Sequence, residues 1–202
     1  MEIVCLDLEG VLIPEIWIGV AEKTSIDALR DTTRDIPDYD ELMQQRLRIM
    51  DENGLGLPII QEVIKGLDPL EGAVEFMAWL RAHFQVVILS DTFYEFGEPF
   101  MRKLGWPTLF CHRLETNLEG KIVNYHLRKK DHKGEAVKSL HDLNFTVFAV
   151  GDSYNDTSML NEADQGILFK APNHVVEEFS HFPVVNTYDE LRAELEKASP
   201  RF

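Results

Sequence analysis

The segment from residue 2 to residue 12 reads Glu2-Ile3-Val4-Cys5-Leu6-Asp7-Leu8-Glu9-Gly10-Val11-Leu12. Its apolar run, Ile3 to Leu6, predicts a strand buried on both faces of a parallel sheet, because such strands are continuously hydrophobic. The run ends at Asp7, and open α/β sheets bind their ligands at the carboxyl ends of their strands. Glu9 follows beside a glycine that frees the backbone to turn. The pattern indicates a nucleophilic carboxylate with a second one close enough to exchange protons; a strand end capped by acids is the alternative.

The composition limits the classes of partner. The 202 residues are enough for one large domain or a domain with an insertion, and 45% hydrophobic and 27% charged residues are ordinary for a globular protein. The formal charge of −15 argues against nucleic acid and anionic membrane surfaces as partners, because both require cationic patches. A small anionic substrate stays compatible with this charge if its site is locally positive.

The two cysteines and the N-terminus indicate a location. Cys5 and Cys111 lie in apolar runs, which is typical of free buried thiols in a reducing compartment. The N-terminus lacks the cationic start and long apolar core of a signal peptide. No stretch approaches the roughly 20 apolar residues that span a bilayer. We therefore expect a cytoplasmic protein, of an oligomeric state that the sequence does not indicate.

Helical and strand patterns follow one another along the rest of the chain. Apolar residues spaced three and four apart predict amphipathic helices at 15–29, 39–50 and 58–64, with no strand among them. Further helices are predicted at 72–83, 94–104, 133–143, from about 156, and at 188–198. Further strands are predicted at 85–89, 108–111, 146–150 and 166–169. Two short runs around Asn117-Leu118-Glu119-Gly120 predict a β-hairpin between His112 and Arg128.

This alternation predicts an α/β fold with a doubly wound parallel sheet and right-handed crossovers. The helical block after the first strand is then an insertion. We expect residues 1–13 and 70–202 to form the α/β core, and residues 14–69 to form a helical domain of their own.

Three of the predicted strands end in polar clusters: Asp7-x-Glu9, Ser90-Asp91-Thr92, and the run Gly-Asp-Ser-Tyr-Asn-Asp at 151–156. In a doubly wound sheet these ends meet at one edge, so they can share one pocket. Crowded carboxylates repel one another unless a cation or a shared proton relieves them. A hard divalent cation with oxygen ligands, Mg²⁺, is the simplest relief.

We expect Asp7 and Asp152 to be direct Mg²⁺ ligands, with the backbone carbonyl of Glu9 as a third and Asp156 supporting them from outside. The alternative for Asp152 and Asp156 is a strand-to-helix turn capped by Asn155. The histidines His126, His132 and His141 lack the spacing of a zinc site, so we expect surface or packing roles for them.

In four motifs that occur in order, the chain resembles the haloacid dehalogenase superfamily of phosphotransferases. The motifs are Asp7-Leu8-Glu9-Gly10-Val11, Ser90, Lys133, and Gly151-Asp152-x-x-Asn155-Asp156, and they cover the core. The helical insertion after the first motif is similar to that of the capped subclass, which includes the phosphoserine phosphatases. The resemblance implies a Rossmann-like core under a specificity cap, and Mg²⁺-dependent phosphoryl transfer.

The resemblance also implies roles for individual residues. Asp7 would attack phosphorus and form an aspartyl-phosphate. Glu9 would protonate the leaving alkoxide and then deprotonate the acceptor. Ser90 and Lys133 would bind the phosphoryl oxygens, and Asn155 would reach the substrate. The alternative for Lys133 is a solvated charge run over residues 128–133.

The substrate is indicated only by this resemblance. Glu15 and Arg46 stand where phosphoserine phosphatases carry an acid for the substrate ammonium group and a base for its carboxylate. Phosphoserine, a phosphorylated amino acid, is therefore the expected substrate. The alternative is that both residues belong to solvated helix faces.

The chain departs from the family pattern at three positions. Glu9 replaces the usual second aspartate, Gly10 replaces a frequent serine, and Asp91 follows Ser90 where glycine is common. Asp91 would contact a substrate ammonium or hydroxyl group, or cap the next helix. A related branch of the family moves the phosphoryl group from phosphoserine to homoserine, so transfer to homoserine is implied beside hydrolysis. Either reaction would belong to serine or threonine biosynthesis.

Two other functions stay open at this point. One is a phosphatase for another small phosphorylated metabolite. The other is a signalling module that is phosphorylated on a strand-end aspartate. Such a module explains neither the helical insertion of about 50 residues nor the acid two positions after Asp7.

Overall fold

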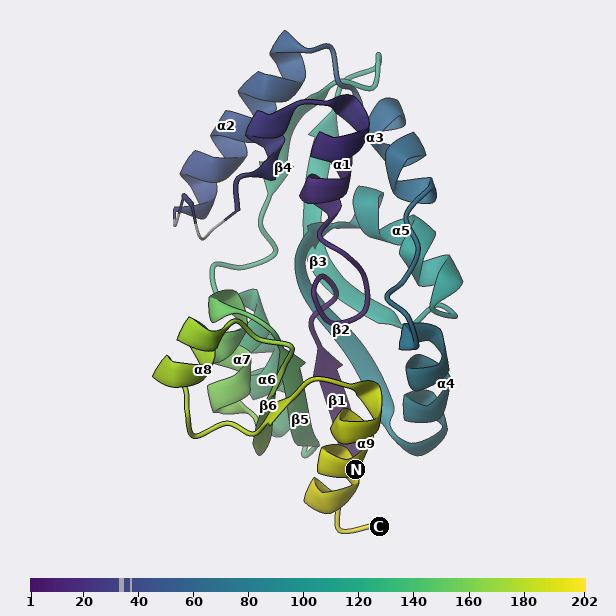
Figure 1. The fold of residues 1–202 in the computed structure, drawn as a ribbon, viewed down its shortest axis with the longest axis vertical. Helices are drawn as coiled ribbons and strands as arrows, with labels where there is room; N and C mark the ends of the chain where they lie inside the picture. The colour runs from purple at the N-terminus through teal and green to yellow at the C-terminus, as the bar shows by residue number, and fades with distance from the viewer. Residues whose placement is uncertain (33–34, 37) are drawn as a thin grey trace.

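The computed structural model describes residues 1–32, 35–36 and 38–202. Within these residues, one seven-stranded sheet has the order β4-β3-β2-β1-β5-β6-β7 (Figure 1). The strands are β1 (Glu2–Leu6), β2 (Gln85–Phe93), β3 (Thr108–Thr116), β4 (Ile122–His126), β5 (Thr146–Gly151), β6 (Gln165–Phe169) and β7 (Val184–Val185). Neighbouring strands are parallel except for β3 and β4, which form the antiparallel hairpin. The α/β fold class predicted from the sequence is confirmed.

The helices cover both faces of the sheet and one of its ends. They are α1 (Ile16–Thr24), α2 (Tyr39–Glu52), α3 (Leu57–Lys65), α4 (Ala73–His83), α5 (Tyr94–Lys103), α6 (His132–Asp142), α7 (Thr157–Glu162), α8 (Asn173–Glu178) and α9 (Tyr188–Ala198), with short 3₁₀ turns η1 (Asp27–Arg30) and η2 (Tyr154–Asp156). Among the described residues, no helix combines the length and the apolar character needed to cross a bilayer.

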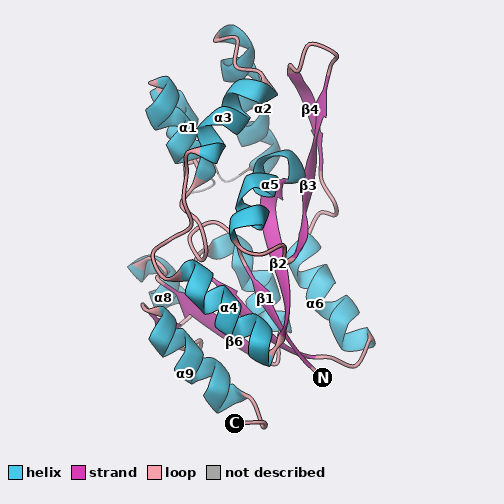
Figure 2. Ribbon diagram, turned by 90° about the vertical axis from the view of Figure 1, so that its right-hand side faces the viewer, coloured by secondary structure: helices cyan, strands magenta, loops and turns pink. Residues whose placement is uncertain are grey.

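Alternate side chains of β1 enter two separate cores, which explains why the strand is apolar throughout. Val4 and Leu6 pack in the core that contains α4 and α9. Ile3 and Cys5 pack in the opposite core, which contains α6 and α7. Figure 2 shows α4 and α6 on opposite sides of the sheet. Burial on both faces fixes β1 at the centre, and Asp7 therefore lies in the middle of the sheet edge.

The helices of the insertion, α1 to α3, gather at the end of the molecule beyond the carboxyl ends of the central strands (Figures 1 and 2). The two ends of this segment are tied together, because the Leu70 amide donates to the Leu12 carbonyl at 2.9 Å. The hairpin rises beside the same helices, and the Leu57 amide donates to the Gly120 carbonyl at 2.9 Å. The insertion is thus held at both its base and its far side.

Some elements differ from the sequence prediction. The predicted helix at 15–29 is broken after Thr24, because Ser25 caps α1 in the left-handed conformation with φ 58°. The strand predicted at 85–89 continues to Phe93 through a register shift. The strand predicted at 108–111 runs on into the hairpin as far as Thr116. Neither α8 nor β7 was predicted; β7 has two residues, too few to show an alternating pattern.

Candidate active site

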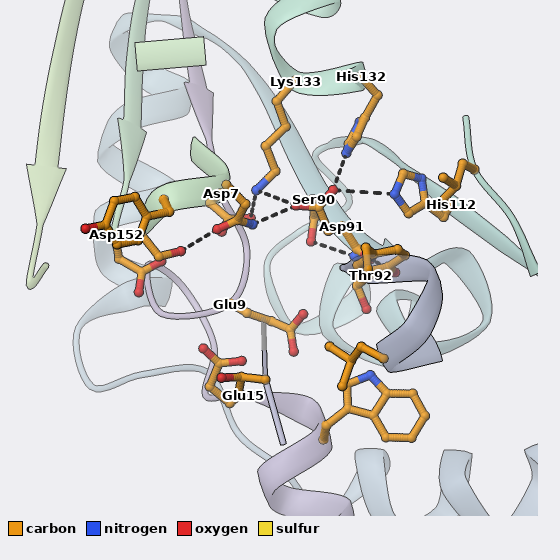
Figure 3. Close-up of a pocket in the computed structure, with 18 of the residues that line it drawn as sticks. Asp7, Glu9, Glu15, Ser90, Asp91, Thr92, His112, His132, Lys133 and Asp152 are labelled. Carbon is orange, nitrogen blue, oxygen red and sulfur yellow. Dashed lines mark hydrogen bonds and ion pairs between the residues drawn. The ribbon is translucent and has the colours of Figure 1, made fainter. Parts of the chain in front are cut away.

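A cavity of about 840 Å³ lies at the carboxyl ends of β1, β2 and β5, facing the inserted helices. Its lining includes these residues predicted from the sequence: Asp7, Glu9, Glu15, Arg46, Ser90, Asp91, Lys133, Asp152 and Asn155. Asp156 is fully buried and joins the site through its contact with Lys133. Figure 3 shows the side chains of Asp7, Ser90, Asp91, Lys133 and Asp152 around one space. The structure therefore brings together segments that are up to about 150 residues apart in the sequence.

Asp7 is held rigidly at the end of β1. Its amide donates to the Val150 carbonyl of β5 at 2.9 Å, and its Oδ1 accepts the Leu8 amide at 2.7 Å. Lys133 Nζ lies 3.1 Å from the same oxygen. Burial raises the pKa of Asp7 well above its ordinary value, the Asp156 carboxylate raises it further, and Lys133 opposes them. Asp7 thus needs more positive charge nearby to be a stable carboxylate.

The loop after β5 is organised around the buried carboxylate of Asp156. Its Oδ2 accepts the amides of Asp152 at 2.9 Å and Ser153 at 3.1 Å, and its Oδ1 accepts from Lys133 Nζ at 2.7 Å. Gly151 permits this turn, because a Cβ there would lie 2.3 Å from the Asp156 Cβ. Asp156 therefore positions the loop and the lysine together, while Asp152 faces the cavity.

The acidic cluster has the composition of a site for a hard divalent cation. Carboxylate oxygens of Asp7, Asp152 and Asp156 lie within 4.8 Å of one another, and all three residues are buried. Since Asp7 and Asp152 line the cavity and Asp156 is fully buried behind it, Asp7 and Asp152 are the two carboxylates suited to bind the ion directly (Figure 3). The backbone at Gly10 approaches closely too, because a Cβ there would lie 2.6 Å from the Asp152 carboxylate.

Lys133 is the central cation of the site. It is 2% exposed, at the start of α6, and its Nζ lies 2.7 Å from Asp156, 3.1 Å from Asp7 and 3.3 Å from Asp91. Burial alone would lower its pKa, but these three carboxylates together raise it well above the ordinary value. Lys133 is therefore a buried ammonium ion, which excludes the alternative of a solvated charge run at this position.

Ser90 lies in β2, where the register against β3 shifts after Leu89, and is 1% exposed. Its Oγ accepts the Thr92 amide at 3.2 Å, so the hydroxyl hydrogen stays available as a donor toward the cavity. Asp7, Lys133 and Ser90 therefore offer an acceptor, a cation and a hydroxyl around one point in the pocket (Figure 3).

Glu9 has a carboxyl group whose pKa is raised by burial. Its Oε1 accepts the Ile16 amide at the start of α1, at 2.7 Å. Burial raises the pKa of Glu9 to about 8, the charge of Glu15 contributes in the same direction, and the Ile16 amide opposes them. At neutral pH Glu9 is therefore mainly protonated, in contrast to an ordinary surface glutamate.

Arg46 brings a buried positive charge from α2. The residue is 6% exposed, its guanidinium carbon lies 4.5 Å from the centroid of the Trp17 ring, and its Nη2 donates to the Asp31 carbonyl at 2.7 Å. Within the described residues its Nε has no hydrogen-bond partner. Burial lowers its pKa to about 10, so the group stays charged at neutral pH. With Glu15 it also lines the cavity, where a zwitterionic ligand would meet both charges.

Two histidines in the pocket were missed or misplaced by the sequence prediction. His132 was expected on the surface or in packing, but its Nε2 lies 3.0 Å from Asp91 Oδ1 in the cavity wall. His112 was not singled out, although its Nε2 lies 3.4 Å from the same oxygen. The signal for His112 was present, since it directly follows the predicted strand 108–111. His126 and His141 do lie at more exposed positions, paired with Glu115 and Asp164.

The model of the haloacid dehalogenase-like hydrolase family matches residues 21–161. The chain belongs to this family. A protein of Pseudomonas aeruginosa named phosphoserine phosphatase ThrH is 64% identical over 201 residues, which cover 100% of this chain and 98% of that protein. A phosphoserine phosphatase of Lactococcus lactis is 30% identical over 181 residues, covering 82% of each chain.

Solved structures of the family share the fold. A phosphoserine phosphatase structure described as a phospho-aspartyl intermediate analogue has a TM-score of 0.79 at 21% identity, covering 97% of this chain and 98% of that chain. A substrate-bound phosphoserine phosphatase has a TM-score of 0.76 at 21% identity, covering 97% of both chains. The resemblance to the haloacid dehalogenase family is thus confirmed by sequence and by fold.

Proposed function

We propose that this protein is a Mg²⁺-dependent phosphoserine phosphatase that acts through a phosphorylated Asp7. The observation that carries the proposal is the buried Asp7 carboxylate with Lys133 Nζ at 3.1 Å, beside the carboxylate of Asp152. The names of the relatives, which match almost the whole chain at 64% identity, support the same activity.

The charges of the site fit a phosphate monoester only when a cation is present. The substrate is a dianion at neutral pH, and its approach to a carboxylate nucleophile is repulsive unless positive charge is already in place. Mg²⁺ held by Asp7, Asp152 and the Glu9 carbonyl would supply that charge when bound. Lys133 supplies one further positive charge, and the Ser90 hydroxyl and Asn155 amide supply neutral donors for the phosphoryl oxygens.

The residues divide the reaction into two displacements. An Asp7 oxygen attacks phosphorus as the ester P–O bond breaks, and Glu9 gives its proton to the serine alkoxide. Glu9, now ionised, takes a proton from an incoming water, whose oxygen attacks the same phosphorus. The bond between phosphorus and the Asp7 oxygen breaks, which restores the carboxylate and releases phosphate. The raised pKa of Glu9 suits the first of these proton transfers.

Recognition of the amino acid would come from the insertion, for which we propose residues 14–69 as a cap over a core of residues 1–13 and 70–202. Glu15 would bind the substrate ammonium group, and Arg46 its carboxylate. Both line the cavity, and burial of the Arg46 guanidinium favours a charged partner. The two buried free thiols fit a reducing, cytoplasmic setting for this enzyme.

An alcohol instead of water could accept the phosphoryl group from Asp7 in the same cavity. We propose that homoserine replaces water in part of the turnovers, because it carries the same ammonium and carboxylate groups as the serine that leaves. Its hydroxyl would then give its proton to Glu9 and attack phospho-Asp7. The alternatives are a phosphatase of another small phosphorylated metabolite and a long-lived phospho-aspartate signal.

Phosphoserine incubated with the protein and Mg²⁺, with and without excess homoserine, tests the proposal by phosphorus NMR. Free phosphate as product supports hydrolysis, and an added phosphohomoserine resonance supports transfer. Unchanged phosphoserine with turnover of another phosphorylated metabolite would establish the first alternative. Stable phospho-Asp7 without release of product would establish the second.

A further inference from the structure

Asp91 is surrounded by four donor groups that come from three different elements. On one oxygen, Oδ1, it meets His132 Nε2 of α6 at 3.0 Å and His112 Nε2 of β3 at 3.4 Å. On the other, Oδ2, it meets Asn155 Nδ2 of η2 at 2.6 Å and Lys133 Nζ of α6 at 3.3 Å. Figure 3 shows the two histidines on one side of this carboxylate. Two hydrogen bonds and two ion-pair contacts occupy both oxygens of the carboxylate, which leaves little room for a substrate ammonium group.

The contact of His112 Nδ1 shows which ring nitrogen of His112 carries the proton. The Arg128 amide donates to His112 Nδ1 at 3.2 Å, so Nδ1 carries no proton. The proton of the neutral ring is therefore on Nε2, which donates to Asp91. A nitrogen that carries this proton has no lone pair for a metal. The trio Asp91, His112 and His132, whose spacing alone would suit a metal ion, is thus a hydrogen-bonded unit.

His132 has the complementary arrangement. Its Nε2 faces Asp91 Oδ1, while its Nδ1 is buried and has no partner among the described residues. The residue is 4% exposed, and burial lowers the pKa of its ring. A neutral ring that donates from Nε2 satisfies the Asp91 oxygen without placing a second charge beside Lys133. Both rings therefore act on Asp91 as neutral donors.

We propose that His112 and His132 are positioning residues, which clamp Asp91 through Oδ1 so that its other oxygen, Oδ2, holds Lys133 and Asn155 in place for the phosphoryl group. The inference rests on the proposed function, in which Lys133 and Asn155 bind phosphoryl oxygens. It gives a role to both histidines and to Asp91, which stands after Ser90 where the family commonly has glycine.

The clamp matters because Lys133 has competing partners. Its ammonium group lies between Asp156, Asp7 and Asp91. If the contact with Asp91 is lost, the ammonium group is drawn toward Asp156 and Asp7. Asn155 depends on the same oxygen, and its Oδ1 already accepts from Ser153 Oγ. A rotation of Asp91 about its Cβ would therefore displace both phosphate-binding groups at once.

The ring protons can be observed directly. Long-range ¹H–¹⁵N NMR of the histidine rings, assigned with His112→Gln and His132→Gln, should show the proton on Nε2 in both residues near neutral pH. A proton on Nδ1 of either ring, or a doubly protonated His112, would overturn the proposal, because that ring would not then be a neutral Nε2 donor to Asp91.

The functional test compares pairs of substitutions. We expect His132→Ala to weaken the binding of inorganic phosphate about 10-fold, measured by calorimetry with Mg²⁺ present, and to lower kcat/KM for phosphoserine. His132→Gln, which keeps a terminal N–H, should stay within about 3-fold of the natural protein. The matched control is His141→Ala on the same helix, which pairs with Asp164 away from the cavity. Equal losses in the alanine and glutamine variants would contradict the proposal.

A double substitution keeps the proposal testable if His132→Ala folds poorly. His112→Ala should by itself weaken phosphate binding, but combined with the isosteric Asp91→Asn it should add no further loss of phosphate affinity to that of Asp91→Asn alone, because the histidine acts through Asp91. Additive losses would overturn the clamp. Phosphate binding that follows these expectations without phosphoserine turnover would refute the proposed function and leave the clamp standing. Phosphoserine turnover with unchanged phosphate affinity in His132→Ala would support the proposed function and refute the clamp.

Discussion

Asp7 and Glu9 are two residues apart, yet their surroundings prepare them for opposite tasks. Asp7 faces Lys133 and the carboxylate of Asp152, where a divalent cation would favour its ionised form. Glu9 faces the Ile16 amide and the charge of Glu15, and its pKa is raised to about 8. Burial raises the pKa of both carboxyl groups, and a cation bound beside Asp7 would lower the pKa of Asp7 and so separate the two values, as a nucleophile and its general acid require.

The pH dependence of the first half-reaction should report on Glu9. Below about pH 8 Glu9 carries the proton that the serine alkoxide needs, so serine release in a single turnover should slow as pH rises through that value. The Glu15 anion raises the pKa of Glu9, so Glu15→Gln should lower this pKa and move the alkaline limb to lower pH. Glu22→Gln, on the exposed face of α1, is the control. A limb that stays in place or moves upward in Glu15→Gln contradicts this role.

Gly10 should be needed for metal binding and not only for the turn. Its φ is +75°, and an added Cβ would lie 2.6 Å from the Asp152 carboxylate. We expect Gly10→Ala to raise the Mg²⁺ concentration for half-maximal activity about 10-fold. The matched control is Gly54→Ala, at φ +65° with nothing within 4 Å, which shares the backbone strain of ~1–2 kcal/mol. Similar metal affinities in both variants would show that the close approach does not matter.

At the level of elements, the apolar runs that predict β1, β2 and β5 also predict where the polar clusters meet. Because these strands are buried on both faces, they are continuously apolar and can be predicted from the sequence. Their carboxyl ends fix the positions of Asp7, Ser90 and Asp152. The sequence is less informative where a strand leaves the buried sheet. Because β3 continues into a half-exposed hairpin, its end at 111 was set too early, and His112 was taken as the start of a separate hairpin.

The short elements escaped prediction for a related reason. The six residues of α8 and the two of β7 are too few for a periodic pattern, and β7 forms by pairing with β6. The tautomer of His112 depends on the amide of Arg128, a tertiary contact that no local pattern encodes.

Arg46 on α2 should select substrates by their carboxylate. We expect Arg46→Ala to lower kcat/KM for phosphoserine about 30–150-fold, the effect of losing a charge-assisted contact of about 2–3 kcal/mol. Turnover of phosphoethanolamine, which lacks the carboxylate, should change little. Steady-state kinetics on both substrates measure the difference. An equal loss on both would assign Arg46 to packing against Trp17 instead.

For the molecule as a whole, the cavity is bounded by two parts that meet at several points. The Leu12 and Leu70 hydrogen bond closes the base of the insertion, and Tyr39 Oη donates to the Asp91 carbonyl at 3.0 Å. On the other side, Lys121 of the hairpin region pairs with Asp51 of α2 at 2.5 Å. The insertion is therefore joined to the core directly beside the reacting groups, which favours a water-poor site.

Removal of the metal should be visible in global stability. Asp7, Asp152 and Asp156 repel one another in the folded protein, so a bound cation relieves the repulsion and stabilises the fold. We expect millimolar Mg²⁺ to raise Tm by a few degrees, and a chelator to reverse it. In Asp152→Asn the metal-dependent rise should shrink, while Tm without metal should be equal or higher. An unchanged metal effect in this variant would exclude Asp152 as a ligand.

The proposed mechanism depends most on Asp7 being the residue that accepts the phosphoryl group. Phosphoserine labelled with ³²P, mixed with enzyme and Mg²⁺ and quenched in acid within one turnover, should leave an acid-stable label on the peptide that contains Asp7. Asp7→Asn should carry no label and lose at least about 10³-fold in kcat. Phosphate release at the natural rate from Asp7→Asn, or a label on another residue, would contradict the account.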